Sequence, residues 1–139
     1  MSVMDTTQLN TDFSRRCVVN SSGLAWQASP SHMVHRRLLE RDGGEDARAT
    51  SIVRYAAGAR FESHLHELGE GILVLEGTLS DEAGDYGPGT YLENPPGSRH
   101  APFSKNGCLL FVKLRHIDPA DSAQGVLDSQ PPSQPTPAF

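Results

Sequence analysis

The segment from Gly58 to His100 constrains the fold more than any other part of the chain. Its first part, GARFESHLHELGEGILVLEG, places His64 and His66 two residues apart, and Glu70 follows four residues after His66. Residues i and i+2 of a β-strand project from the same face, so a strand here would direct both imidazoles into one space. The pattern therefore predicts two side chains of a common site.

The rest of this segment predicts how the site is completed. Glycines on both sides of Glu70 favour a tight reversal that brings the carboxylate from a neighbouring strand towards the same point. The sequence GTYLENPPGSRH (89–100) then reads as a strand, a rigid Asn-Pro-Pro-Gly turn and His100 at the start of the next strand. Imidazole and carboxylate groups are suitable ligands for divalent transition metals. We therefore predict a metal site formed by His64, His66, Glu70 and His100.

The remainder of the chain has the pattern of an all-β domain. Strand-like segments lie at 33–39, 49–57, 61–66, 71–79, 86–93, 100–103 and 108–116, with turns at 41–46, 81–85 and 105–107. Nine glycines fall between Gly58 and Gly107 inclusive. No segment shows a convincing helical period, so short strands and frequent turns predict a sandwich or barrel.

The length of the chain, 139 residues, fits one domain. We expect an N-terminal extension (1–22) with one short edge strand at Val18-Val19, a barrel (23–117) and a tail (118–139). The tail contains five prolines and few large apolar residues. Such a composition buries too little surface to offset the entropy of ordering, so a flexible Pro-rich tail is expected.

The net charge and the cysteines limit which partners and which cellular compartment are expected. The net charge is −5 and no basic cluster is present, which argues against nucleic acid as a partner. No apolar run approaches the roughly 18 residues of a membrane span. The sequence from Ser14 to Val19 faintly resembles a twin-arginine signal, but polar residues follow it at once. Cys17 and Cys108 form no CxxC pair, so we expect free thiols and a cytoplasmic protein.

The two motifs resemble those of the cupin superfamily. The residues that match the first motif are Gly58, His64, His66, Glu70 and Gly77, and those that match the second are Gly89, Pro95, Gly97 and His100. Ser104 stands where the second motif has asparagine, a loop position outside the metal shell. The resemblance implies an RmlC-like jelly-roll barrel with a metal site.

Within cupins, residues 24–116 are most similar to the ChrR cupin-like family. The similar segments include TSIVRYAAGARFESHLHELGE and ILVLEGTLSDEAGDYGPGTYLENPPGSRHAP, although Gly71 stands where the family often has a second glutamate. ChrR is an anti-sigma factor with a separate zinc-binding module, of which we expect no counterpart here. Other relatives of this type are iron-dependent dioxygenases acting on diketones or aromatic ketones, some without the glutamate ligand.

Several further residues are assigned to a pocket around the metal. Arg54 and Tyr55 point to opposite faces of their strand, so one of them is expected to line it. Ile72 and Val74 alternate with Glu70 and should form an apolar wall, and Phe103 is expected to close another side. Outside this pocket we expect an ion-pairing role at the end of the barrel for Glu76, and packing or surface roles for Trp26, His32, His35 and His116.

The resemblance and the ligand set lead to an expected function with open alternatives. We expect one divalent ion per chain, Fe²⁺ or Zn²⁺ first and Mn²⁺ or Ni²⁺ as alternatives. A tetrahedral ion with four protein ligands would be closed and structural or a metal store, whereas higher coordination leaves a position for chemistry. The first hypothesis is a dioxygenase-type enzyme acting on a small carbonyl or enolisable substrate. The alternative is a non-catalytic sensory or regulatory module, and in either case small cupins imply a homodimer formed through edge strands.

Overall fold

The structure is a computed structural model that describes residues 7–43, 48–61, 64–66 and 69–114. Its elements are β1 (Thr7–Leu9), the 3₁₀ helix η1 (Ser21–Gly23), β2 (Gln27–Ala28), β3 (Val34–Gly43), β4 (Arg48–Tyr55), β5 (His64–His66), β6 (Glu70–Gly77), β7 (Leu79–Asp81), β8 (Gly84–Tyr86), β9 (Tyr91–Asn94), β10 (Ser98–His100) and β11 (Cys108–Leu114). Within these ranges η1 is the one helical element, and no helix is long and apolar enough to cross a membrane. The predicted tail (118–139) and His116 lie outside the described residues.

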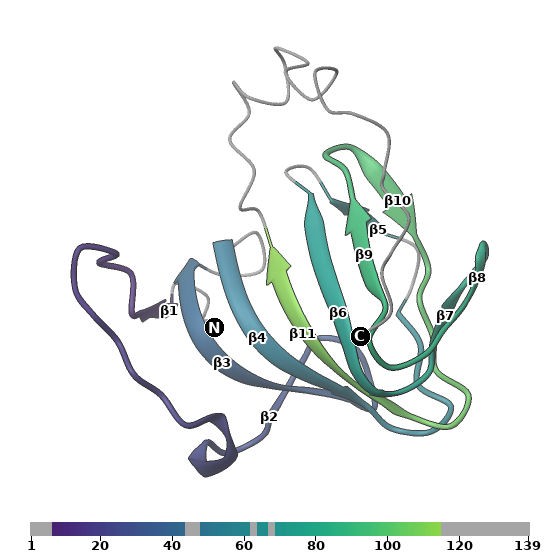
Figure 1. Ribbon diagram of the computed structural model, residues 1–139, viewed down its shortest axis with the longest axis horizontal. Helices are drawn as coiled ribbons and strands as arrows, with labels where there is room; N and C mark the ends of the chain where they lie inside the picture. The colour runs from purple at the N-terminus through teal and green to yellow at the C-terminus, as the bar shows by residue number, and fades with distance from the viewer. Residues whose placement is uncertain (1–6, 44–47, 62–63, 67–68, 115–139) are drawn as a thin grey trace, which may run out of the picture.

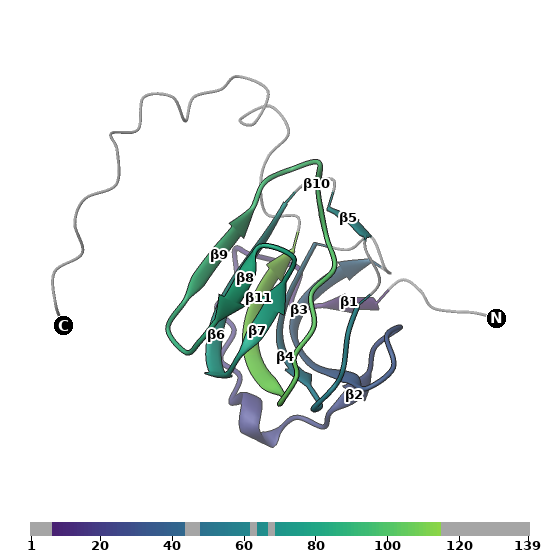
Figure 2. The same ribbon diagram turned by 90° about the vertical axis from the view of Figure 1, so that its right-hand side faces the viewer.

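The strands form one large curved sheet and two short antiparallel ribbons (Figure 1). The large sheet has the order β1-β3-β4-β11-β6-β9, and β2 pairs with the outside of β3. The ribbons β5–β10 and β7–β8 face the concave side of this sheet (Figure 2). The chain therefore encloses its core between two β-layers, which confirms the predicted all-β class.

The core occupies the concave face because inward residues alternate along β4, β11 and β6. One row of the ladder joins Val53, Leu110 and Val74, and all three side chains are buried. The other core residues are Val34, Tyr55, Ala59, Ile72, Leu79, Cys108 and Val112. Full burial of each aliphatic side chain contributes roughly 1.5–3 kcal/mol. This face, here called the inner face, therefore holds the fold together and sets the position of every residue on it.

A β-bulge near the end of β6 sets the orientation of Glu76. Leu110 pairs with Val74 but the preceding Leu109 pairs with Glu76, so Leu75 is an extra residue on the β6 side. An extra residue reverses the alternation of side chains beyond it. Glu76 is consequently exposed and shares the outer face with Leu109, whereas a regular strand would have placed it on the face of Glu70.

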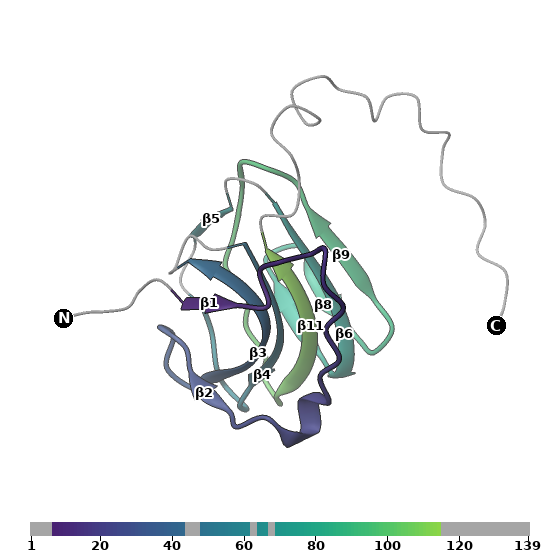
Figure 3. The same cartoon turned by 90° about the vertical axis from the view of Figure 1, so that its left-hand side faces the viewer.

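The N-terminal segment crosses the outer, convex face of the large sheet (Figure 3). Trp26 lies between the guanidinium groups of Arg37 and Arg54, each 4.2 Å from the ring centroid. The predicted edge strand at Val18-Val19 is wrong, since Val18 is 77% exposed and the edge strand is β1 instead. Trp26 packs as expected, but against cationic side chains on the outer face rather than in the core.

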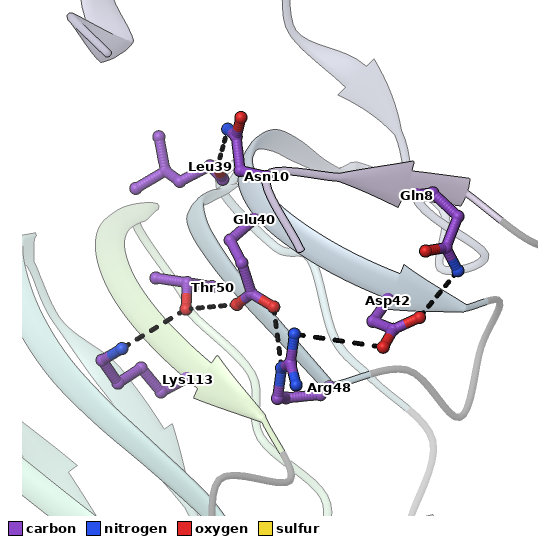
Figure 4. A network of polar contacts seen from close by, with 8 residues as sticks. All are labelled: Gln8, Asn10, Leu39, Glu40, Asp42, Arg48, Thr50 and Lys113. Atoms are coloured by element: carbon purple, nitrogen blue, oxygen red, sulfur yellow. Dashed lines mark hydrogen bonds and ion pairs between the residues drawn. The ribbon is translucent and has the colours of Figure 1, made fainter. Parts of the chain in front are cut away.

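A polar network fixes the outer face of β3 and β4 (Figure 4). The buried carboxylate of Glu40 accepts hydrogen bonds from Arg48 Nε and from Thr50 Oγ1, both at 2.9 Å. Lys113 Nζ lies 3.4 Å from the same Thr50 hydroxyl, and Asp42 lies 4.0 Å from Arg48. Hydrogen bonds to the charged form make burial of a carboxylate tolerable. The strands that support the inner face are thus also joined on their outer side.

Most of the other strand predictions agree with the structure apart from shifts at the ends, but the single strand expected at 86–93 is divided between β8 and β9, which belong to different sheets. β3, β4, β6 and β11 cover the expected segments, and β7 and β8 form the expected hairpin around residues 82–83. The segment expected as a strand at 100–103 is displaced, because β10 ends at His100. Phe103 instead makes isolated bridges to Arg60 and Ser80, which join this segment to β7.

Candidate metal centre

Glu70 opens β6 at the last row of the inner face. It pairs with Leu114 of β11 on one side and with Asn94 of β9 on the other, and it is 9% exposed. The side-chain amide of Asn94 donates to Glu70 Oε1 at 3.2 Å. A buried carboxylate held by a side-chain donor has a fixed direction. Glu70 therefore presents its charge to the interior from the end of the sheet.

His100 brings a second polar group to the same point from the opposite layer. It ends β10, it is 7% exposed, and its Nε2 lies 3.1 Å from Glu70 Oε1. Burial acts to lower the pKa of His100, but the hydrogen bond with Glu70, the charge of that carboxylate and the charges of Asp81 and Glu82 together outweigh burial and raise the pKa above its usual value. The contact thus links the large sheet to the β5–β10 ribbon by an imidazole–carboxylate pair.

The register of β5 and β10 places the two remaining predicted ligands beside this pair. His64 pairs with His100, and His66 pairs with Ser98. Directly paired residues of an antiparallel ladder share a face, as do residues two apart in one strand. His64, His66, Ser98 and His100 therefore share one face of the ribbon. The side chains of His64 and His66 lie outside the described part of the structure, so the ladder fixes their backbone positions alone.

The donor atoms that are described fit a divalent metal. Two ligand atoms each about 2.1 Å from an ion and at right angles to one another lie roughly 3.0 Å apart. The distance between His100 Nε2 and Glu70 Oε1, 3.1 Å, is close to this value. Among residues with described side chains no group of three metal-binding side chains occurs, and the side chains of His64 and His66 are not among those described. Imidazole and carboxylate donors together suit Fe²⁺, Zn²⁺, Mn²⁺ and Ni²⁺.

Tyr55 and Arg54 take opposite faces, as expected, and the structure shows which residue faces inward. Tyr55 is buried in the core with its ring centroid 5.9 Å from that of Phe61, whereas Arg54 is exposed and stacks on Trp26. Burial first, then the charges of Glu70 and Cys108, raise the pKa of Tyr55 well above its usual value. Tyr55 therefore keeps its proton at neutral pH, and Arg54 does not line the interior.

Of the other predicted pocket residues, Ile72 and Val74 lie on the Glu70 face, and Phe103 lies beside Arg60. Ile72 and Val74 are buried beside Glu70 along β6 and form an apolar surface there. Phe103 is half-buried, with the Arg60 guanidinium 5.3 Å from its ring centroid. Ile72 and Val74 therefore exclude water on the β6 side of the site. The ring of Phe103 contacts Arg60, and its backbone forms a bridge to Ser80 of β7.

Three residues that the sequence reasoning did not assign also belong to this region. Asn94 is the first residue of the Asn-Pro-Pro-Gly turn and Ser98 follows the turn, and the alternation of strands around it could have indicated both of them. Arg41, 4% exposed, pairs with Ala49 on the inner face, in the row that continues through Leu114 to Glu70. A β-bulge between Leu38 and Glu40 sets that orientation, which strand periodicity alone does not predict.

A hollow lies outside the barrel, between the N-terminal segment and the outer face. Its volume is about 470 Å³, and its lining includes Phe13, Arg15, Cys17, Glu40 and Lys113. Glu40 belongs to the network of Figure 4. This hollow is thus separated from Glu70 and His100 by the sheet itself.

Both cysteines are free, Cys17 exposed and Cys108 buried, and burial raises the pKa of the Cys108 thiol.

The curved sheet, the facing ribbons and the histidine–glutamate pair between them define a cupin. The chain belongs to the family of ChrR cupin-like domains, whose family model matches residues 14–118. This confirms the predicted superfamily and family. Comparison with curated protein sequences finds no match.

Solved structures agree on the fold. An acetylacetone dioxygenase from Acinetobacter johnsonii superposes with a TM-score of 0.59 at 15% identity, covering 82% of this chain and 80% of that one. The polyketide cyclase RemF from Streptomyces resistomycificus has a TM-score of 0.59 at 18% identity, covering 76% and 83%. The Rhodobacter sphaeroides complex of SigE with the anti-sigma ChrR has a TM-score of 0.56 at 21% identity, covering 68% and 50%. At such identities the likeness shows the fold alone.

Proposed function

We propose that this cupin binds one divalent metal ion through His64, His66, Glu70 and His100, and uses it in a dioxygenase-type reaction on a small carbonyl or enolisable substrate. The observation that carries the proposal is the buried contact between His100 Nε2 and Glu70 Oε1 at 3.1 Å, with His64 in register opposite His100. The acetylacetone dioxygenase fold match supports the choice of substrate class. Fe²⁺ is the metal expected for oxygen chemistry, with Zn²⁺, Mn²⁺ and Ni²⁺ as alternatives.

The chain supplies the surroundings that such chemistry requires. A bound divalent ion would act as a Lewis acid and, as iron, as a redox centre for dioxygen. Asn94 holds Glu70 through the 3.2 Å hydrogen bond, which fixes the direction of a ligand. Ile72 and Val74 keep the β6 side of the site dry, and a low dielectric strengthens polarisation of a bound carbonyl. Tyr55, which keeps its proton, and Arg41 also lie on this inner face.

Removal of the metal tests this proposal. Apoprotein prepared with a chelator is expected to consume no oxygen with acetylacetone or an aromatic ketone, and anaerobic reloading with Fe²⁺ is expected to restore consumption. His66→Ala should lose both the bound metal and turnover, because it removes one donor from the set. Oxygen consumption and metal content are measured on the same samples. Full turnover in metal-free protein would rule the proposal out.

A second candidate function has one observation in its favour. The match to ChrR in complex with SigE leaves open a non-catalytic module in which bound metal alters a partner-binding surface. That function predicts no turnover and a partner captured by the metal-loaded protein alone. Capture of the same partners by apo and loaded protein would exclude it. The homodimer and the cytoplasmic location stay predictions in either case.

A further inference from the structure

The hydroxyl of Ser98 is a buried polar group that the fold leaves without a partner. Ser98 opens β10, two residues before His100. Its Oγ is shielded from solvent and makes no hydrogen bond. A buried hydroxyl without a partner destabilises the folded state, because hydrogen bonds to water are lost and none replaces them. The Ser98 hydroxyl therefore lowers the stability of the folded protein.

The position of Ser98 relates the hydroxyl to the candidate metal centre. Ser98 and His100 are two residues apart in β10 and share a face, and His100 on that face reaches Glu70 at 3.1 Å. Across the ribbon Ser98 pairs with His66, and His100 pairs with His64. The hydroxyl thus lies on the face of the ribbon that carries all three predicted histidine ligands.

Two buried serines in the described part of the chain, Ser80 and Ser104, differ from Ser98 because their hydroxyls have partners. Ser104, 0% exposed, donates to the carbonyl of Thr78 at 2.6 Å, and Ser80 donates to Asp85 Oδ1 at 2.6 Å. Each of these hydroxyls stabilises a connection within the fold. Since Ser98 makes no such connection, a purely structural role does not account for its hydroxyl.

We propose that the Ser98 hydroxyl donates a hydrogen bond to an oxygen atom of the small molecule that binds at the metal centre. This inference rests on the proposed function, because it requires a ligand at that centre. The ligand class is an oxygen chelator such as a β-diketone or its enolate, whose oxygen accepts the hydrogen bond. Ser98 is then a substrate-contacting residue that selects for an oxygen acceptor beside the metal.

Ser98→Ala distinguishes this role from a structural one. The apo variant is expected to unfold at the same temperature as wild type or a higher one, since an unpartnered buried hydroxyl has been removed. In the Ni²⁺-loaded protein its affinity for acetylacetone, measured anaerobically by calorimetry, should fall by about tenfold. Its Ni²⁺ affinity should stay at the wild-type value. Ser98→Thr keeps a hydroxyl and should bind acetylacetone within about threefold of wild type.

Ser104→Ala is the matched control, because it removes a buried serine hydroxyl that has a partner in the fold. It should lower the unfolding temperature and leave acetylacetone affinity unchanged. A fall in the unfolding temperature of Ser98→Ala as large as that of Ser104→Ala would overturn the inference. So would unchanged acetylacetone affinity in Ni²⁺-loaded Ser98→Ala, or no binding of the diketone by Ni²⁺-loaded wild type. Failure of wild type to take up any metal would instead overturn the proposed function, and this inference with it.

Discussion

His100→Ala is expected to abolish stoichiometric metal binding and to destabilise the apoprotein. The variant removes one predicted ligand and the group that lies 3.1 Å from Glu70 Oε1. Loss of an outer-shell partner already lowers metal affinity by about 10–100-fold, so loss of a ligand should exceed 100-fold, as measured by competition with a chromogenic chelator. Removal of one member of a buried ion pair costs about 3 kcal/mol, and the remaining hydrogen bond from Asn94 should limit the loss in free energy of unfolding.

His32→Ala is the matched control for this variant. His32 is exposed, precedes β3 and has no part in the histidine–glutamate pair. Its metal affinity and its free energy of unfolding, measured by urea titration, should equal those of wild type. Wild-type metal affinity in His100→Ala would show that His100 is an ordinary buried histidine paired with Glu70.

Gly77→Ala should destabilise the barrel more than any other single-methyl addition in the cupin motifs. Gly77 has φ +74°, and a Cβ there would lie 2.2 Å from the carbonyl oxygen of Gly107 and 2.8 Å from Cys108 Cα. These are backbone atoms of the neighbouring strand and its turn, so β6 and β11 would have to separate. A residue with a side chain in this conformation costs about 1–3 kcal/mol before any clash is counted. We expect a loss of about 3 kcal/mol or more in urea unfolding.

Gly71→Ala provides the comparison on the same strand. A Cβ at Gly71 would meet the hydroxyl of Tyr91 at 2.7 Å, which is the far end of an exposed side chain that can turn away, and the φ of Gly71 is unstrained. The expected change is within about 1 kcal/mol of wild type, partly offset by the lower entropy of the unfolded chain. Equal effects of the two substitutions would contradict the account of the close approach at Gly77.

The sequence predicted the fold because strand alternation and turn chemistry determine it locally. The inner rows of β4, β6 and β11 follow the apolar alternation, and the glycines fall where the chain turns. Side chains depart from a regular alternation where a strand carries an extra residue. The bulge at Leu75 sent Glu76 outward, and the bulge after Leu38 oriented Arg41 inward. A bulge depends on pairing with a distant strand, so a local pattern does not reveal it.

The candidate site was predictable as a set of ligand types but not as an arrangement. The motif spacing indicated Glu70 and His100, and the structure brings these two together across two layers. The roles of Asn94 and Ser98 depend on the pairing of β6 with β9 and of β5 with β10. Such pairings join residues far apart in the chain. The choice between Arg54 and Tyr55 likewise required the register of β4 against β11.

The most direct test of the metal centre is the metal content of protein purified anaerobically, combined with X-ray absorption spectroscopy of the bound ion. The account predicts about one iron per chain, with imidazole nitrogen and carboxylate oxygen ligands and a coordination number of about five or six. That result would leave room for an oxygen-chelating substrate. Stoichiometric four-coordinate zinc without bound water, or protein that holds no metal at all, would contradict it.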